Sequence, residues 1–242
     1  MLSKNQIKLI KSLSQKKYRQ QLNLFTVEGV KGINEFLNSH YKLQALFTTA
    51  SVFEADHHLI EMISETDLKR ISALKNPNTA LAIFEIPQAQ SPSKNGLQLA
   101  LDAVRDPGNL GTIIRLCDWY GVDDLICSTT TVDCYNTKVV QATMGSLTRV
   151  NVTYLNLEAY LDATSLPVYG TFMNGDNIYT ADLPNEGIIV LGNEANGISK
   201  PVEDFVGEKI TIPQFGTLAT TESLNVANAA AIVLSEFRRR TY

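Results

Sequence analysis

Three glycine-containing segments in the second half of the chain carry polar side chains that can position or polarise a substrate. They are DPGNLGTIIR at 106–115, VLGNEANGIS at 190–199 and IPQFGTLATTESLNVANAAA at 212–231. Each segment follows a run of apolar residues typical of a strand, and ligands of open α/β sheets bind beyond the carboxyl ends of strands. Glycine also lets the backbone approach a ligand closely. The sequence therefore predicts that the three segments converge on one site.

The first segment places an amide and a cation on one short stretch. Asn109 precedes Arg115 by six residues, which is under two turns of the helix predicted at 110–121. The guanidinium of Arg115 can hold a phosphate or stabilise a developing alkoxide. The alternative is structural, with Asn109 as a helix N-cap and Arg115 in a surface salt bridge. The chain has no GxGxxG and no GxxxxGK[ST], which weakens a dinucleotide or P-loop function.

The other two segments supply a carboxylate and further polar groups. Glu194 follows a buried strand, where it can cap a helix, fix an arginine or bind a ribose hydroxyl. Ser223 and Asn225 stand at the start of an alanine-rich helix predicted at 222–239. The exposed N–H groups of a helix start suit an anionic or polar ligand, and simple N-capping by Ser223 is the alternative.

The first half of the chain predicts a small α/β unit. A polar stretch with proline and glycine at 88–96 predicts a linker, so we expect one domain at 1–94 and a second at 95–242. The expected strands of the first domain are 24–29, 43–49 and 79–87, and its expected helices are 3–20, 30–40 and 64–72.

The second half alternates strands and helices, which predicts a mostly parallel sheet with helices on both faces. The expected strands are 97–104, 124–128, 149–155, 167–173, 187–192 and 208–213, and the expected helices are 110–121, 137–146, 157–164 and 222–239.

Composition is that of a globular protein, with 44% hydrophobic and 19% charged residues. No apolar run is long enough to span a bilayer, and the N-terminus does not read as a signal peptide. Cys117, Cys127 and Cys134 lack metal-ligand spacing, which predicts buried thiols in a reducing cytoplasm rather than disulfides or zinc ligands. The three histidines indicate no metal site.

Charge is unevenly distributed along the chain. Residues 1–20 carry six basic residues and no acid, and 238–240 are three arginines, whereas 21–237 hold 12 basic against 25 acidic residues. Basic ends on an acidic body are typical of a phosphate-binding surface. The alternative is a solvated basic helix together with a C-terminal helix whose dipole favours cations.

The three segments resemble the signature motifs of the SpoU (TrmH-like) RNA ribose 2′-O-methyltransferases of the SPOUT superfamily. The matching residues of the first two motifs are Asn109, Gly111 and Arg115, then Leu191, Gly192, Glu194 and Gly197. The third motif matches at 223–226, followed by the alanine-rich 227–231. The resemblance covers about 97–242. It continues more loosely at TVEG, 26–29, which is similar to the start of a ribosomal-protein-like RNA-binding domain.

This resemblance implies a fold, a reaction and a site. The expected fold is α/β, with a small ribosomal-protein-like domain followed by a mostly parallel SPOUT domain containing a deep trefoil knot, a rare exception to the rule against threaded chains. The implied reaction is methyl transfer from S-adenosylmethionine to a ribose 2′-hydroxyl of rRNA or tRNA. The implied catalytic residues are Asn109, Arg115, Glu194, Ser223 and Asn225, and the implied cofactor-binding residues are Leu191, Gly192, Ile212, Ser223 and Leu224. A homodimer is implied, without a metal, a membrane or DNA.

Two departures and two alternatives accompany the resemblance. Residues 217–221 make the third segment longer than is usual, and Asp102 stands where many members have asparagine, so its role is left unassigned. The alternatives are a non-catalytic RNA-binding or ribosome-assembly protein on the same scaffold, and a nucleotide-dependent enzyme of another α/β class. We also expect a chain lacking 1–94 to keep a folded, dimeric, cofactor-binding core that binds RNA much more weakly.

Overall fold

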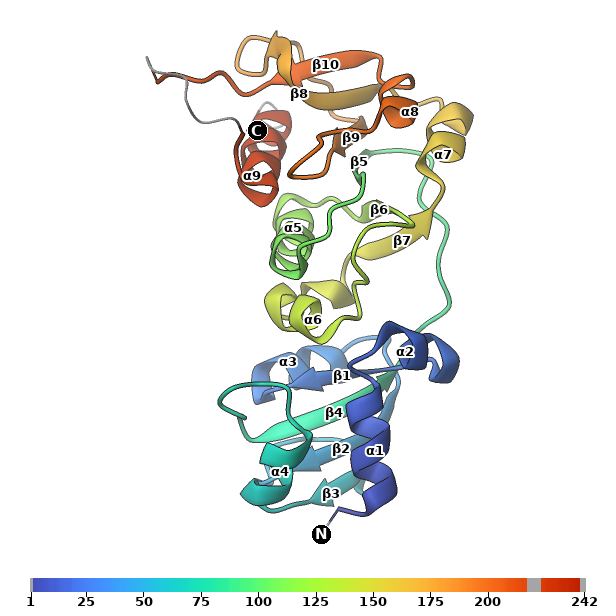
Figure 1. Ribbon diagram of the computed structural model, residues 1–242, viewed down its shortest axis with the longest axis vertical. Helices are drawn as coiled ribbons and strands as arrows, with labels where there is room; N and C mark the ends of the chain where they lie inside the picture. The colour runs from blue at the N-terminus through green and yellow to red at the C-terminus, as the bar shows by residue number, and fades with distance from the viewer. Residues whose placement is uncertain (1, 217–222, 240–242) are drawn as a thin grey trace. The chain divides into compact units, whose positions relative to one another are not determined.

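The chain forms two compact units (Figure 1). A computed structural model describes residues 2–216 and 223–239. Unit 1 contains residues 1–88 and also 133–148, and unit 2 contains 89–132 and 149–242. The chain therefore leaves unit 2 after residue 132 and returns to it at residue 149. The boundary near residue 94 stays a prediction.

Unit 1 is built on a four-stranded sheet with the order β1-β4-β2-β3. Strand β4 is antiparallel to β1 and β2, while β2 and β3 are parallel. The strands are β1 (Leu24–Glu28), β2 (Leu43–Thr48), β3 (Ile60–Met62) and β4 (Ala80–Glu85). The helices are α1 (Lys4–Ser12), α2 (Lys16–Leu22), α3 (Val30–Leu37), α4 (Glu65–Ile71) and α6 (Thr137–Thr143), with 3-10 turns at His57–Leu59 and Ser146–Thr148.

The single helix predicted at 3–20 is wrong, because the chain breaks into α1 and α2. The hydroxyls of Ser12 and Ser14 donate to the carbonyls of Leu9 and Lys11, a local bonding that competes with helix continuation. The turn that follows α1 buries Leu13 completely in the apolar core of unit 1. An amphipathic pattern persists through such a turn, so it did not reveal the break.

Arg19, counted above among the basic residues of the N-terminus, is not part of a surface. Its side chain is only 2% exposed. It donates to Asp133 from Nε at 3.0 Å and from Nη2 at 2.5 Å, and from Nη1 to the Leu13 carbonyl at 2.8 Å. A buried cation needs such a partner, because isolated charges are costly to desolvate. The ion pair thus ties α2 to the segment 133–148 inside unit 1.

The same segment joins the aromatic core of unit 1. Tyr135 lies with its ring centroid 4.7 Å from that of Phe25 on β1, and the hydroxyls of Tyr135 and Tyr41 are 3.3 Å apart. Burial raises the pKa of both Tyr41 and Tyr135, so both remain neutral hydrogen-bonding groups at physiological pH. Residues 133–148 are therefore an integral part of the core of unit 1.

We expect Asp133→Asn to lower the free energy of unfolding by about 3 kcal/mol, because it leaves the buried Arg19 charge uncompensated. The matched control is Asp118→Asn, which breaks another Asp–Arg pair whose arginine, Arg149, is 48% exposed. The control substitution should lower the free energy of unfolding by about 1 kcal/mol or less. Chemical denaturation of both variants measures the difference, and equal losses would contradict a special role for the buried pair.

Unit 2 is built on a six-stranded sheet with the order β10-β8-β9-β5-β6-β7, in which every neighbouring pair is parallel. The strands are β5 (Leu97–Leu101), β6 (Asp124–Ser128), β7 (Asn151–Leu155), β8 (Val168–Asn177), β9 (Gly187–Leu191) and β10 (Glu208–Thr211). The helices are α5 (Pro107–Tyr120), α7 (Leu157–Ala163), α8 (Lys200–Glu203) and α9 (Val226–Arg239). The predicted parallel sheet is confirmed, and α8 was not foreseen.

Helices cover both faces of this sheet (Figure 1). Helices α5 and α9 pack against each other on one face, and α7 contacts α8 on the other. Ala100 of β5 packs with Leu161 of α7 and Val202 of α8, so its neighbours Leu99 and Leu101 point to the α5 and α9 side. The three cysteines are buried, as predicted. Within the described ranges, no helix is long and apolar enough to cross a membrane.

Candidate active site

The three polar segments follow the carboxyl ends of strands in the unit 2 sheet. The first follows β5 and enters α5, the second follows β9, and the third lies between β10 and α9. Strands β5 and β9 are parallel neighbours, with Leu101 opposite Leu191 at their carboxyl ends. The first two segments therefore begin side by side.

Two hydrogen bonds join one residue from each segment. Asn225 Nδ2 donates to Asn109 Oδ1 at 3.0 Å, and Asn109 Nδ2 donates to Glu194 Oε1 at 2.7 Å. The predicted convergence of the three segments is thus confirmed, although the role of each residue stays a prediction. Asn109 uses both ends of its amide, which fixes its orientation. The second carboxylate oxygen of Glu194 has no hydrogen-bond partner in 2–216 or 223–239 and can accept from a ligand.

Asp106, not Asn109, caps α5. Its Oδ1 accepts from the Asn109 backbone N–H at 2.8 Å, and Pro107 occupies the first helical position, where its missing N–H costs nothing. The helix therefore begins at residue 107 rather than at 110, and Asn109 lies in its first turn. The structural alternative for Asn109 as a cap is wrong, so its side chain is available for the contacts described above.

The second segment is folded tightly on itself. Asn193 and Gly197 exchange two backbone hydrogen bonds, of 2.9 and 2.8 Å, and Gly197 has a left-handed φ of 68°. A Cβ on Gly192 would lie 2.1 Å from the carbonyl carbon of Gly197, which no side chain could tolerate without a shift of the backbone. Gly192 is therefore required by the close approach within this loop.

Two side chains hold this loop to the end of β5. Asn193 Nδ2 donates to the Ala103 carbonyl at 2.7 Å, and the Ser199 N–H donates to Asp102 Oδ2 at 2.8 Å. Asp102, left unassigned from the sequence, is a buried carboxylate that anchors the far end of the loop. Sequence reasoning missed both residues. The signal available was an asparagine in a glycine-rich turn, where its side chain commonly bonds to nearby backbone.

The third segment reaches the site through Asn225, which caps α9. Its Oδ1 accepts from the N–H groups of Ala227 at 3.0 Å and Asn228 at 3.3 Å. The helix begins at Val226, so the predicted start at 222 and the N-capping alternative for Ser223 are wrong. Ser223 and Leu224 are exposed next to the cap, and Ile212 follows β10. The longer stretch at 217–221 lies outside the described residues.

Arg115 lies exposed on α5, in a stripe with Thr112 and Trp119. Its guanidinium makes no hydrogen bond or ion pair with any residue that the structure describes, so the salt-bridge alternative has no support there. An unpaired surface guanidinium is well suited to bind an anion. Cys117, two residues further, is fully buried, and burial raises the pKa of its thiol. The thiol is therefore not a nucleophile for this site.

The backbone around the site offers free polar groups. The N–H and C=O groups of Gly192, Ile212 and Leu224 form no hydrogen bond within the described parts of the chain. Such groups can bind the polar atoms of a small molecule. The two hydrogen bonds thus bring together a carboxylate and two linked amides, which can orient a hydroxyl group. Among the described residues, no hydrogen bond links Arg115 or the Ile212 backbone to this group.

Two family models match the chain. The model described as the SpoU rRNA Methylase family matches residues 96–235, and the model described as an MRM3-like substrate binding domain matches residues 4–82. The first match contains all of the site residues discussed above.

Similar proteins are known over the full length of the chain. The 23S rRNA (guanosine(2553)-2′-O)-methyltransferase RlmP of Bacillus subtilis is 30% identical over 98% of this chain and 97% of its own length. A TrmH-family protein from Porphyromonas gingivalis has a solved structure that superimposes with a TM-score of 0.91, at 42% identity and 99% coverage of both chains. The structure of the AdoMet-bound rRNA methyltransferase from Sinorhizobium meliloti superimposes with a TM-score of 0.88, at 31% identity, with 100% of this chain and 98% of that chain covered.

Proposed function

The chain belongs to the SpoU rRNA methylase family, and we propose that Asn109, Glu194 and Asn225, with Arg115 and Ser223, form its reacting centre. The protein is an S-adenosylmethionine-dependent RNA 2′-O-methyltransferase with a SPOUT-type fold. One observation carries the proposal for the centre, namely the two hydrogen bonds that link Asn225 to Asn109 and Asn109 to Glu194.

The residues of the proposed centre have distinct tasks. When bound, S-adenosylmethionine supplies an electrophilic methyl group, and the ribose oxygen must approach it in line. The second carboxylate oxygen of Glu194 accepts a hydrogen bond from the 2′-hydroxyl and takes its proton during the transfer. Arg115 binds the adjacent phosphate and stabilises negative charge that develops on the ribose oxygen. Because a ribose hydroxyl is weakly acidic, correct placement and charge stabilisation account for most of the acceleration.

For the cofactor, we propose contacts from Leu191, Gly192, Ile212, Ser223 and Leu224. The unused backbone groups of Gly192, Ile212 and Leu224 support this assignment, since they fit the polar atoms of an adenosine and an amino acid. The trefoil knot that accompanies this fold class is part of the same proposal. No metal enters the mechanism.

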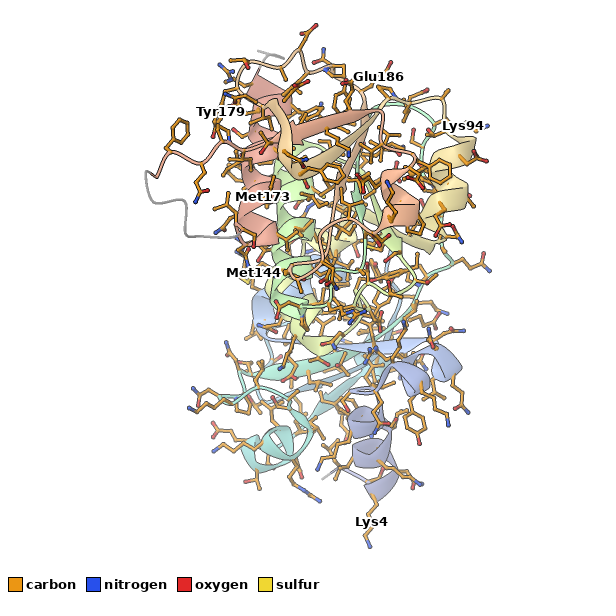
Figure 2. The ribbon with its side chains drawn as sticks, turned by 45° about the horizontal axis from the view of Figure 1, so that its top comes forward. Lys4, Lys94, Met144, Met173, Tyr179 and Glu186 are labelled. Carbon is orange, nitrogen blue, oxygen red and sulfur yellow. The ribbon has the colours of Figure 1, made fainter. Side chains whose placement is uncertain are left out.

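We further propose that the substrate is rRNA and that unit 1 contributes to its binding. Helix α1 presents Lys4, Lys8 and Lys11, which are exposed and spaced by four and three residues on one face. Figure 2 shows Lys4 extending away from the start of α1. Such a stripe suits a phosphate backbone. The name of the Bacillus subtilis relative, a 23S rRNA enzyme, favours rRNA over tRNA.

The proposal also includes a domain boundary, an oligomeric state and a cellular location. We place the domain boundary near residue 94, in the polar stretch that precedes β5. We propose a homodimer, in keeping with the family resemblance. The cytoplasm is the proposed location, because three buried free thiols fit a reducing compartment.

The experiment is methylation of an unmodified large-subunit rRNA transcript with labelled S-adenosylmethionine, followed by mapping of the 2′-O-methyl group. We expect one ribose to be methylated. A well-folded, cofactor-binding protein that methylates neither this transcript nor unmodified tRNA would contradict the proposed function. Methylation of tRNA alone would contradict only the choice of rRNA.

The lysine stripe has its own prediction. The salt dependence of RNA binding is the slope of log K against the logarithm of the salt concentration. Changing Lys4, Lys8 and Lys11 to glutamine should make this slope shallower by about two to three units, because each lost phosphate contact removes about one unit. The matched control changes three scattered exposed lysines, Lys42, Lys69 and Lys94, so the loss of charge is the same. Equal slopes in the two triple variants would argue against a phosphate-binding stripe on α1.

A further inference from the structure

Unit 1 contains an open cavity of about 700 Å³ between α3 and the loop that precedes β4. One face of α3 and the residue after it supply most of the wall, and the loop 72–79 supplies the rest. The lining residues are Val30, Lys31, Asn34, Glu35, Asn38 and Asn78. More of the exposed surface of this wall is apolar than polar, but its three asparagines and one lysine can form hydrogen bonds.

The hydrogen-bonding capacity of this cavity is largely unused. The side chains of Lys31, Asn34 and Asn38 make no hydrogen bond or ion pair with any residue in 2–216 or 223–239. Asn78 accepts one bond from the Thr79 hydroxyl, which leaves its amide N–H groups to donate. A ligand with several donors and acceptors along one edge would therefore find partners here.

One lining residue, Glu35, packs against Gly145 of the segment 133–148. Gly145, with a left-handed φ of 98°, lies so close to Glu35 that a Cβ on it would be 2.5 Å from the Glu35 Cγ. Glu35 also has a polar interaction of its own. All of the lining residues belong to unit 1.

We propose that this cavity binds one unpaired nucleotide of the RNA substrate, with Asn34 and Asn38 contacting the base edge and Lys31 the flanking phosphate. Carboxamides form paired hydrogen bonds with base edges, and sequence-specific RNA binding relies on splayed, unpaired bases. The lysine stripe on α1 would bind RNA without regard to sequence, whereas this cavity would select a base. This inference rests on the proposed function, because it assumes an RNA substrate.

The test uses the full-length double variant Asn34→Ala/Asn38→Ala and the unmodified large-subunit rRNA transcript. We expect its dissociation constant for the transcript to rise about tenfold or more, with an unchanged salt slope, because amide–base contacts release no counterions. Lys31→Gln should instead lower the slope by about one unit. The KM for RNA should rise, while kcat and the affinity for S-adenosylmethionine remain unchanged. Alanine favours helix, so α3 should fold normally, and thermal unfolding will verify this.

The matched control is Gln20→Ala/Gln21→Ala, which removes two exposed amides from α2 of the same unit. If the asparagine variant binds the transcript as tightly as this control, the inference is overturned. A lower kcat at unchanged RNA affinity would also overturn it. The proposed function fails separately, if the wild-type protein binds RNA and S-adenosylmethionine but methylates no transcript.

Discussion

Replacing Arg115 with alanine is expected to lower the rate of RNA methylation by about a hundredfold or more while the fold remains intact. The side chain is exposed and makes no hydrogen bond or ion pair with the described chain, so its loss breaks none of these. Its guanidinium should act on the ribose oxygen and phosphate in the transition state. Arg115→Lys should recover activity only in part, because an ammonium lacks the planar fork. Single-turnover methylation kinetics provide the measurement.

The control for this prediction is Arg149→Ala, which removes a half-exposed arginine whose charge is already paired with Asp118 on the same helix as Arg115. The methylation rate of this variant should stay within about twofold of wild type. A surface ion pair contributes only to stability, by about 1 kcal/mol or less, so its loss should not affect the reaction. Wild-type turnover in Arg115→Ala would refute the proposed role of Arg115.

A second large effect is expected from Gly192→Ala. The added methyl group would lie 2.1 Å from the Gly197 carbonyl carbon and 2.2 Å from the Ile198 nitrogen, so the loop must move. Overpacking of this kind costs about 1–3 kcal/mol, and here the displaced atoms belong to the proposed cofactor-binding loop. We expect the affinity for S-adenosylmethionine, measured by calorimetry, to fall about tenfold or more.

Gly207→Ala is the matched control, because a Cβ there would meet only the Val168 carbonyl oxygen at an ordinary 3.7 Å. This variant should bind the cofactor like the wild-type protein. Equal affinities in Gly192→Ala and Gly207→Ala would show that the tight turn at residue 192 does not shape the cofactor site.

The sequence predicted the unit 2 sheet well, because continuous apolar runs such as 187–191 are characteristic of parallel strands buried on both faces. It also located the three converging segments. Helix starts were less accurate, since Asp106, Asn109, Ser223 and Asn225 all have side chains that can cap, and only the hydrogen bonds reveal which of them does.

Contacts between residues far apart in the chain could not be predicted from local sequence patterns. Nothing near Arg19 indicates that a carboxylate 114 residues away neutralises it inside the core. The helical pattern at 137–146 was predicted, but amphipathicity does not reveal which sheet a helix covers. Because this segment packs with unit 1, a chain lacking 1–94 would expose Tyr135 and Leu147 to solvent, and its free energy of unfolding should be reduced.

The interrupted path of the chain has a consequence for biosynthesis. The core of unit 1 needs Tyr135 against Phe25, yet residues 89–132 are made before that partner appears. At roughly 5–20 residues per second, the 60 residues between 88 and 148 take roughly 3–12 seconds to emerge. During that interval the nascent N-terminal region carries an unneutralised Arg19 and an incomplete aromatic cluster. Unit 1 can therefore complete its core only after two of the six strands of the unit 2 sheet, β5 and β6, have been translated.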